Sequence, residues 1–108
     1  MARYLIQASY SAQGASALVK DPQDRAAMVR QMMEGMGGKL ESFDYAFGDH
    51  DVVAIGELPD NVAMAAISMA IAASGALSSF KTTVLIPMSE AVEAMRKAGT
   101  VGYRPPGS

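Results

Sequence analysis

The chain has 108 residues, of which 50% are hydrophobic and 19% charged, and it contains no cysteine. This length suffices for one domain with its own hydrophobic core and is too short for two. The lack of cysteine excludes disulfide frameworks, Fe–S clusters and cysteine-based zinc sites. Nine Lys and Arg against eleven Asp and Glu give a net charge of -2 with no basic stripe, so we expect no nucleic-acid partner.

No segment has the features of a signal peptide or a membrane span. Gln7 and Ser9 interrupt the apolar residues that follow the N-terminus. The longest apolar stretch, residues 62–73, is about half the length that crosses a bilayer. We therefore expect a cytoplasmic protein with no membrane partner.

The first predicted elements are a strand and two helical segments. Residues 4–10 alternate an apolar set with a mixed set, the period-2 pattern of a strand. Residues 11–20 are rich in alanine, Asp21-Pro22 interrupts them, and Asp24 can cap a second helix that runs to about Met36. The stripe of this helix that we expect to face the core consists of Val29, Met32, Met33 and Met36. Its methionines, with Met28, fit core packing better than an adaptable binding surface.

A hairpin follows these helices. Residues 40–47 alternate again and predict a strand. Its aromatic face, which we expect in the core, carries Phe43, Tyr45 and Phe47. Residues 48–51 have turn composition, and residues 52–58 are apolar on both faces, which indicates a central strand.

The second half repeats the helix and strand pattern. Asp60 is the expected N-cap of a helix that runs through Ser74 and is closed by Gly75. Residues 77–86 predict a fourth strand, which Pro87 ends.

A short helix and a tail end the chain. Residues 88–97 predict a helix with Ser89 as its cap. Residues 101–108 contain two consecutive prolines and favour an extended path. We expect this tail to pack against the domain body or a neighbouring subunit.

The order βαββαβ with an extra C-terminal helix predicts an α+β fold, a ferredoxin-like plait with both helices on one face of the sheet. We expect residues 1–100 to form one domain and residues 101–108 a proline-rich tail. Residues 52–58 show no polar face, so the second face of the sheet should be apolar and bare in a monomer. Such a face predicts a homodimer in which two sheets pack together.

Almost the whole chain resembles the GYD-domain family. The residues that carry the resemblance are Tyr4 to Ser11, Gly38 to Ser42, Gly48 to Asp51, Leu58 to Asn61, Lys81 to Leu85 and Gly102 to Gly107. The family's Gly-Asp-Tyr-Asp turn is similar to Gly48-Asp49-His50-Asp51, with His50 in place of the tyrosine. The resemblance implies a dimeric α+β barrel in bacterial proteins of mostly unassigned function. Related barrel families include cofactor-free monooxygenases, haem-degrading enzymes and small-ligand sensors.

His50 is the only histidine. Histidine can act as an acid or base near neutral pH or bind a metal or haem iron. If residues 49–51 were extended, Asp49 and Asp51 would share one face and His50 would point to the other, so neither carboxylate would orient its ring. A tight turn would instead bring the three side chains together. Of the two alternatives we expect a polar surface or pocket-rim group, and we predict no metal site.

Polar residues on the mixed strand faces are the remaining candidates. They are Gln7, Ser9, Ser42, Asp44, Lys81 and Thr83. They either converge in a small-ligand cavity or face solvent, and strand phase alone does not choose between these interpretations. The full set of candidate pocket residues is Gln7, Tyr10, Asp44, Asp49, His50, Asp51 and Thr83.

Two functional hypotheses follow. The first is a small-ligand-binding or cofactor-independent enzyme module whose ligand is small and apolar or aromatic, with no cofactor. The alternative is a non-catalytic oligomerisation or regulatory module; a haem-binding version of the first would need His50 as axial ligand. Motifs for phosphate-binding loops, zinc proteases and hydrolase elbows are absent from the sequence. The sequence does not decide whether the protein is an enzyme.

Overall fold

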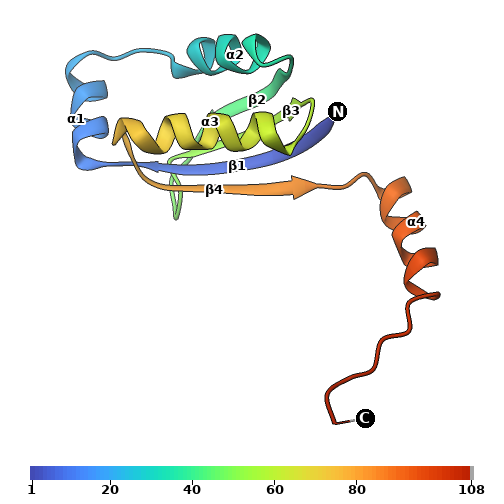
Figure 1. Cartoon of the computed structure of the whole chain (residues 1–108). Coiled ribbons are helices and arrows are strands. Elements are labelled where there is room, and N and C mark those ends of the chain that lie inside the picture. Colours follow the sequence, from blue (N-terminus) through green and yellow to red (C-terminus); the bar gives the residue numbers. More distant parts are fainter. Residues whose placement is uncertain (108) are drawn as a thin grey trace.

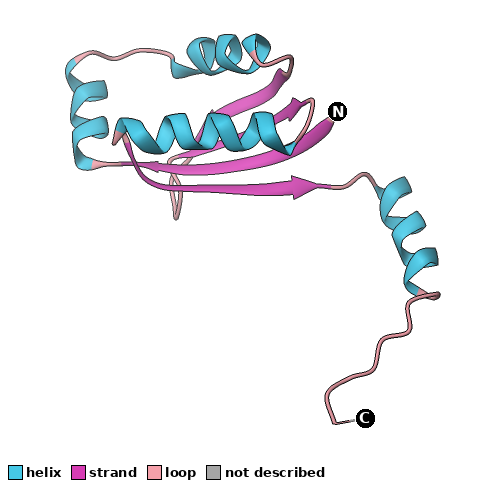
Figure 2. Ribbon diagram, viewed as in Figure 1, coloured by secondary structure: helices cyan, strands magenta, loops and turns pink. Residues whose placement is uncertain are grey.

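The computed structural model describes residues 1–107 as a four-stranded sheet with helices (Figures 1 and 2). The strands are β1 (Ala2–Tyr10), β2 (Lys39–Tyr45), β3 (Val52–Leu58) and β4 (Leu77–Leu85). The helices are α1 (Ala12–Lys20), α2 (Arg25–Gly35), α3 (Asn61–Ser74) and α4 (Met88–Ala98). All neighbouring strands are antiparallel, in the order β2-β3-β1-β4. The predicted α+β class and element order are confirmed, and the topology fits a ferredoxin-like plait.

Most helix boundaries lie where the capping residues predict them. Asp24 Oδ1 accepts a hydrogen bond from the Ala26 N–H at 2.8 Å, and Asp60 Oδ1 accepts one from the Ala63 N–H at 2.9 Å. Gly75 closes α3 with a φ of 74°, a left-handed conformation that glycine adopts without strain. The prediction of Ser89 as the cap of α4 is wrong: this helix begins at Met88, and Pro87 at its N-cap offers no side-chain acceptor.

The hydrophobic core lies between one face of the sheet and helices α2 and α3. Its buried members are Tyr4, Ile6, Met33, Leu40, Ala54, Leu58, Ala63, Met64 and Ile67. The Tyr4 hydroxyl donates a hydrogen bond of 2.6 Å to Asn61 Oδ1 and so joins β1 to the first residue of α3. Burial raises the pKa of Tyr4, and the negative charge of Asp60 raises it further.

Four residues predicted in the core are exposed, one of them Met28 at 40%. Phe47 is 96% exposed and Tyr45 66%, because β2 ends at Tyr45 and the chain then turns away as a loop. Met36 is 39% exposed because α2 ends one residue earlier, at Gly35. Phe43 alone of the aromatic row packs against the core. An alternating pattern gives the phase of a strand but not the residue at which it ends.

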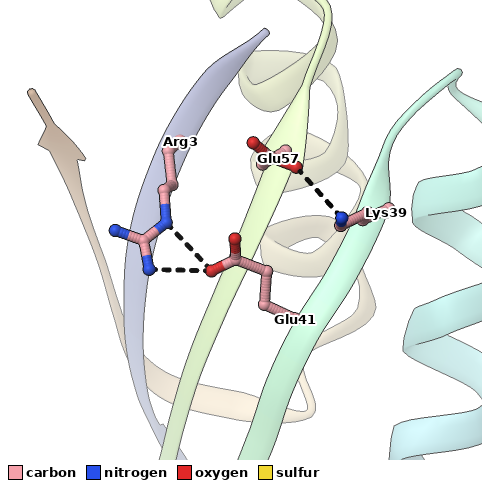
Figure 3. A network of polar contacts seen from close by, with 4 residues as sticks. All are labelled: Arg3, Lys39, Glu41 and Glu57. Atoms are coloured by element: carbon pink, nitrogen blue, oxygen red, sulfur yellow. Dashed lines mark hydrogen bonds and ion pairs between the residues drawn. The ribbon is translucent and has the colours of Figure 1, made fainter. Parts of the chain in front are cut away.

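None of the described helices covers the second face of the sheet, which we call the open face (Figure 1). Strand register places on it an apolar stripe of Leu5, Val53 and Ile55. Charged residues lie beside this stripe: Arg3 pairs with Glu41 at 2.9 Å, and Lys39 with Glu57 at 3.7 Å (Figure 3). The prediction that β3 has no polar face is therefore wrong, since Glu57 lies on the open face. The face is an apolar stripe with a charged border.

Helix α4 and the tail extend away from the sheet (Figure 1). Among residues 1–107, no helix or strand packs extensively against α4. The Cα radius of gyration is 17.5 Å, whereas a compact domain of this length has about 13 Å. Val101 and Tyr103 are 66% and 74% exposed, so packing of the tail on its own domain is not observed. Within residues 1–107, no helix is both long and apolar enough to span a membrane.

Candidate ligand cavity

A cavity of about 270 Å³ lies between the helix-covered face of the sheet and helices α2 and α3. Its walls are almost entirely apolar. The larger apolar residues that line it are Ile6, Phe43 and Phe80 from the sheet and Met28, Met32, Met64, Ile67 and Ile71 from the helices. A concave apolar space of this kind is the usual form of a small-molecule site.

Short side chains account for the unfilled space. Ala8 on β1 and Ala54 on β3 lie on the sheet side of the cavity, and Ala70 on α3 and Ala76 before β4 lie on its border. Ala8 and Ala54 are buried, so the sheet under the helices is covered there by methyl groups alone. Larger residues around them hold the helices at a distance that alanine cannot fill.

Three polar residues line the cavity: Tyr10, Arg25 and Ser74. The Ser74 hydroxyl donates to the Ile71 carbonyl at 2.6 Å and is therefore engaged within α3. Burial raises the pKa of Tyr10, the positive charge of Arg25 opposes this, and the charges of Asp51 and Tyr45 add to it. The Tyr10 phenol is thus protonated at neutral pH and available as a hydrogen-bond donor.

The loop between β2 and β3 holds the end of β1 in place. Asp51 Oδ2 accepts a hydrogen bond from the Tyr10 N–H at 3.0 Å, and the Asp51 N–H donates to the Ala8 carbonyl at 2.9 Å. The Ala46 N–H donates to the Asp51 carbonyl at 2.8 Å and closes the loop. Asp51 therefore fixes the backbone of a residue that lines the cavity.

We expect Asp51→Ala to lower the free energy of unfolding by about 1.5–3 kcal/mol, the usual range for a hydrogen bond to a charged group. Asp49→Ala is the matched control in the same loop, because Asp49 is exposed and contributes only its backbone carbonyl, to the Ser9 hydroxyl at 3.3 Å. Urea denaturation of both variants measures the difference. Equal effects of the two substitutions would contradict the role given to the Asp51 side chain.

The structure separates the seven residues predicted for the pocket. Tyr10 lines the cavity. Gln7, Asp44 and Thr83 share the open face on the opposite side of the sheet. Asp49, His50 and Asp51 form the loop that follows β2. Tyr10 and Asp51 are in contact, and the structure does not bring the open-face residues to the cavity.

His50 is half-buried in its loop, and its Nδ1 atom is buried without a hydrogen-bond partner among residues 1–107. It is not among the residues that line the cavity. Nor is there a cluster of three or more His, Asp or Glu side chains placed to hold a metal ion in the described part of the chain. His50 therefore lies outside the lining of the cavity.

Sequence reasoning missed Arg25 as a cavity residue. Arg25 is the first residue of α2 and directly follows the Asp24 cap. From the sequence, an arginine at this position is expected to be exposed to solvent. The methionines of α2 did carry a signal, since their number gave rise to the hypothesis of an adaptable surface. In the structure Met33 belongs to the core, and Met28, Met32 and Met33 all line the cavity.

A protein-family model matches most of the chain. The model of a family described as the GYD domain matches residues 4–95. This range contains all four strands, apart from the first two residues of β1, and helices α1 to α3 together with most of α4. No curated protein matches the sequence.

Proposed function

We propose, for a chain that belongs to the GYD-domain family, that the cavity between the sheet and helices α2 and α3 binds a small apolar or aromatic molecule. The single observation that carries this proposal is the cavity itself, with Phe43 and Phe80 among its walls. Aromatic and aliphatic walls favour an apolar ligand because its transfer from water to such a site is favourable. A volume of about 270 Å³ can hold a molecule of up to three aromatic rings.

The protonation of Tyr10 and the position of His50 favour ligand binding over acid–base catalysis as the function of the cavity. Tyr10 has a raised pKa, so its phenol donates a proton in a hydrogen bond and is a poor base at neutral pH. His50, the residue best suited to general acid–base work, does not line the cavity. The cavity thus offers apolar contact and hydrogen-bond donors.

A neutral fluorescent probe, N-phenyl-1-naphthylamine, tests the proposal. We expect its fluorescence to rise on binding to the protein, and we expect Ala54→Leu, which places three more carbon atoms in the cavity, to weaken binding at least tenfold. Ala66→Leu is the matched control, because it adds the same three carbon atoms at an exposed position of α3 that does not line the cavity. Melting curves establish that both variants are folded. Unchanged affinity in Ala54→Leu would place the probe outside the cavity and contradict the proposal.

A second copy of the chain is the partner that we propose for the open face. An apolar stripe with a charged border is the usual composition of a protein interface. Helix α4 supports the same proposal: Met88, Val92 and Met95 recur at helical spacing, and all three are exposed. In a single chain, the open face and the apolar residues of α4 are both exposed to solvent. Association of two copies would bury these apolar surfaces.

Light scattering at micromolar concentration tests the assembly. We expect a mass of twice 11.3 kDa for the native chain. Leu5→Lys should reduce the mass to that of one chain, because it places a charge in the apolar stripe, while Val19→Lys on the exposed surface of α1 should leave the dimer intact. A single-chain mass for the native protein would contradict the homodimer.

A further inference from the structure

Arg25 is the only charged residue that lines the cavity within the described chain. It is half-buried, and it is the first residue of α2. The other lining residues are apolar apart from Tyr10 and Ser74, and the Ser74 hydroxyl is engaged within its own helix. One cation therefore lies at the wall of a site that is otherwise suited to a hydrocarbon.

This guanidinium has no acidic partner in the part of the chain that the structure describes. Among residues 1–107, the ion pairs are those of Arg3 with Glu41 and Lys39 with Glu57. Arg25 Nη1 donates one hydrogen bond of 3.0 Å, to the neutral Gln23 Oε1, which leaves its other N–H groups without a side-chain acceptor. The nearest acidic group on its own segment, Asp24, is occupied as the cap of α2, through the Ala26 N–H.

Tyr10 is a second hydrogen-bond donor that lines the cavity. The positive charge of Arg25 acts on the Tyr10 phenol, and both side chains line the cavity. Asp51, whose negative charge also acts on Tyr10, accepts a hydrogen bond from the Tyr10 backbone N–H and does not line the cavity. The cavity therefore presents a cationic donor and a neutral donor from two different elements.

We propose that the ligand is a small hydrophobic carboxylic acid, bound as its anion with the carboxylate at Arg25 and Tyr10 and the apolar body among the phenylalanines and methionines. This inference rests on the proposed ligand-binding function and names the class of ligand. A guanidinium matches a carboxylate through two parallel hydrogen bonds. A single cation in apolar walls suits a monoanion better than a phosphate ester, which carries up to two charges and needs more donors.

Two probes of the same shape test the class of ligand: 1-naphthoic acid, which is anionic at pH 7, and 1-naphthamide, which is neutral. Calorimetric titration of the full chain in 0.15 M salt gives both affinities. We expect the native protein to bind the acid at least tenfold more tightly than the amide, as for a hydrogen-bonded charge pair. Arg25→Met should weaken binding of the acid at least tenfold and change that of the amide less than threefold.

Arg30→Met is the matched control, because Arg30 lies on the same helix, is exposed and does not line the cavity. It removes the same charge from α2 and should leave both affinities unchanged. Equal binding of acid and amide by the native protein would overturn the carboxylate inference while leaving the cavity as a binding site. Weakening by Arg30→Met as strong as by Arg25→Met would overturn it too, since the effect would then come from net charge. Failure of both probes and of the neutral fluorescent probe would instead overturn the proposed function.

Discussion

Leu58→Ala should destabilise the protein by about 3–5 kcal/mol, the upper range for removal of a buried leucine side chain. Leu58 is fully buried at the end of β3 and belongs to the core between the sheet and the helices. The substitution removes apolar contacts and leaves a space that neighbouring strands cannot close. Since small domains unfold at a cost of about 5–15 kcal/mol, this is a large part of the total stability.

Urea denaturation at one fixed protein concentration measures this effect, because assembly makes stability depend on concentration. Val19→Ala is the control, since Val19 is 80% exposed on α1 and should change stability by less than about 0.5 kcal/mol. A loss as small for Leu58→Ala as for Val19→Ala would show that Leu58 lies outside the core.

Gly38→Ala should also destabilise the fold strongly, by about 2–3 kcal/mol. A Cβ atom at Gly38 would collide with the backbone carbonyl of Glu57 and lie 2.7 Å from Leu58 Cδ2. The segment cannot move away easily, because the Gly38 N–H donates to the Met33 carbonyl at 2.8 Å at the end of α2. The strand pair β2–β3 would have to separate at this point to admit a methyl group.

Gly35→Ala provides the comparison three residues earlier. A Cβ at Gly35 meets no atom within 4 Å, so alanine should be neutral or stabilise the last turn of α2 by up to about 1 kcal/mol. Thermal unfolding of the two variants distinguishes them. Equal melting temperatures for Gly38→Ala and the native protein would contradict the close approach of the two backbones.

The elements of the fold could be predicted from local chemistry. Asp24 and Asp60 mark helix starts because their carboxylates bond backbone N–H groups, and both predictions are confirmed. The ends of elements depend on long-range contacts instead. Phe47 continues the alternation of β2, but the Ala46 to Asp51 hydrogen bond closes the loop before it and leaves its ring in solvent.

The residues of the cavity were harder to predict from the sequence than the elements of the fold. Alternation of apolar and polar residues divides a strand into two faces, but it does not indicate which face the helices cover. Gln7 and Thr83 share a face with Leu5, and only the packing of α2 and α3 decides that this face is the open one. Arg25, the first residue of α2, and Tyr10, the last of β1, line the same cavity, a placement that no local sequence pattern indicates.

The methyl groups of the nine methionines provide the most direct test of the cavity as the ligand site. The four that line it are Met28, Met32, Met33 and Met64, and the five that do not are Met1, Met36, Met69, Met88 and Met95. In protein labelled with ¹³C at the methionine methyl groups, we expect titration with 1-naphthoic acid to shift the four cavity signals and leave the other five in place. Shifts confined to Met88 and Met95 or to the remaining outer methionines, with the four cavity signals unmoved, would contradict a ligand site between the sheet and its helices.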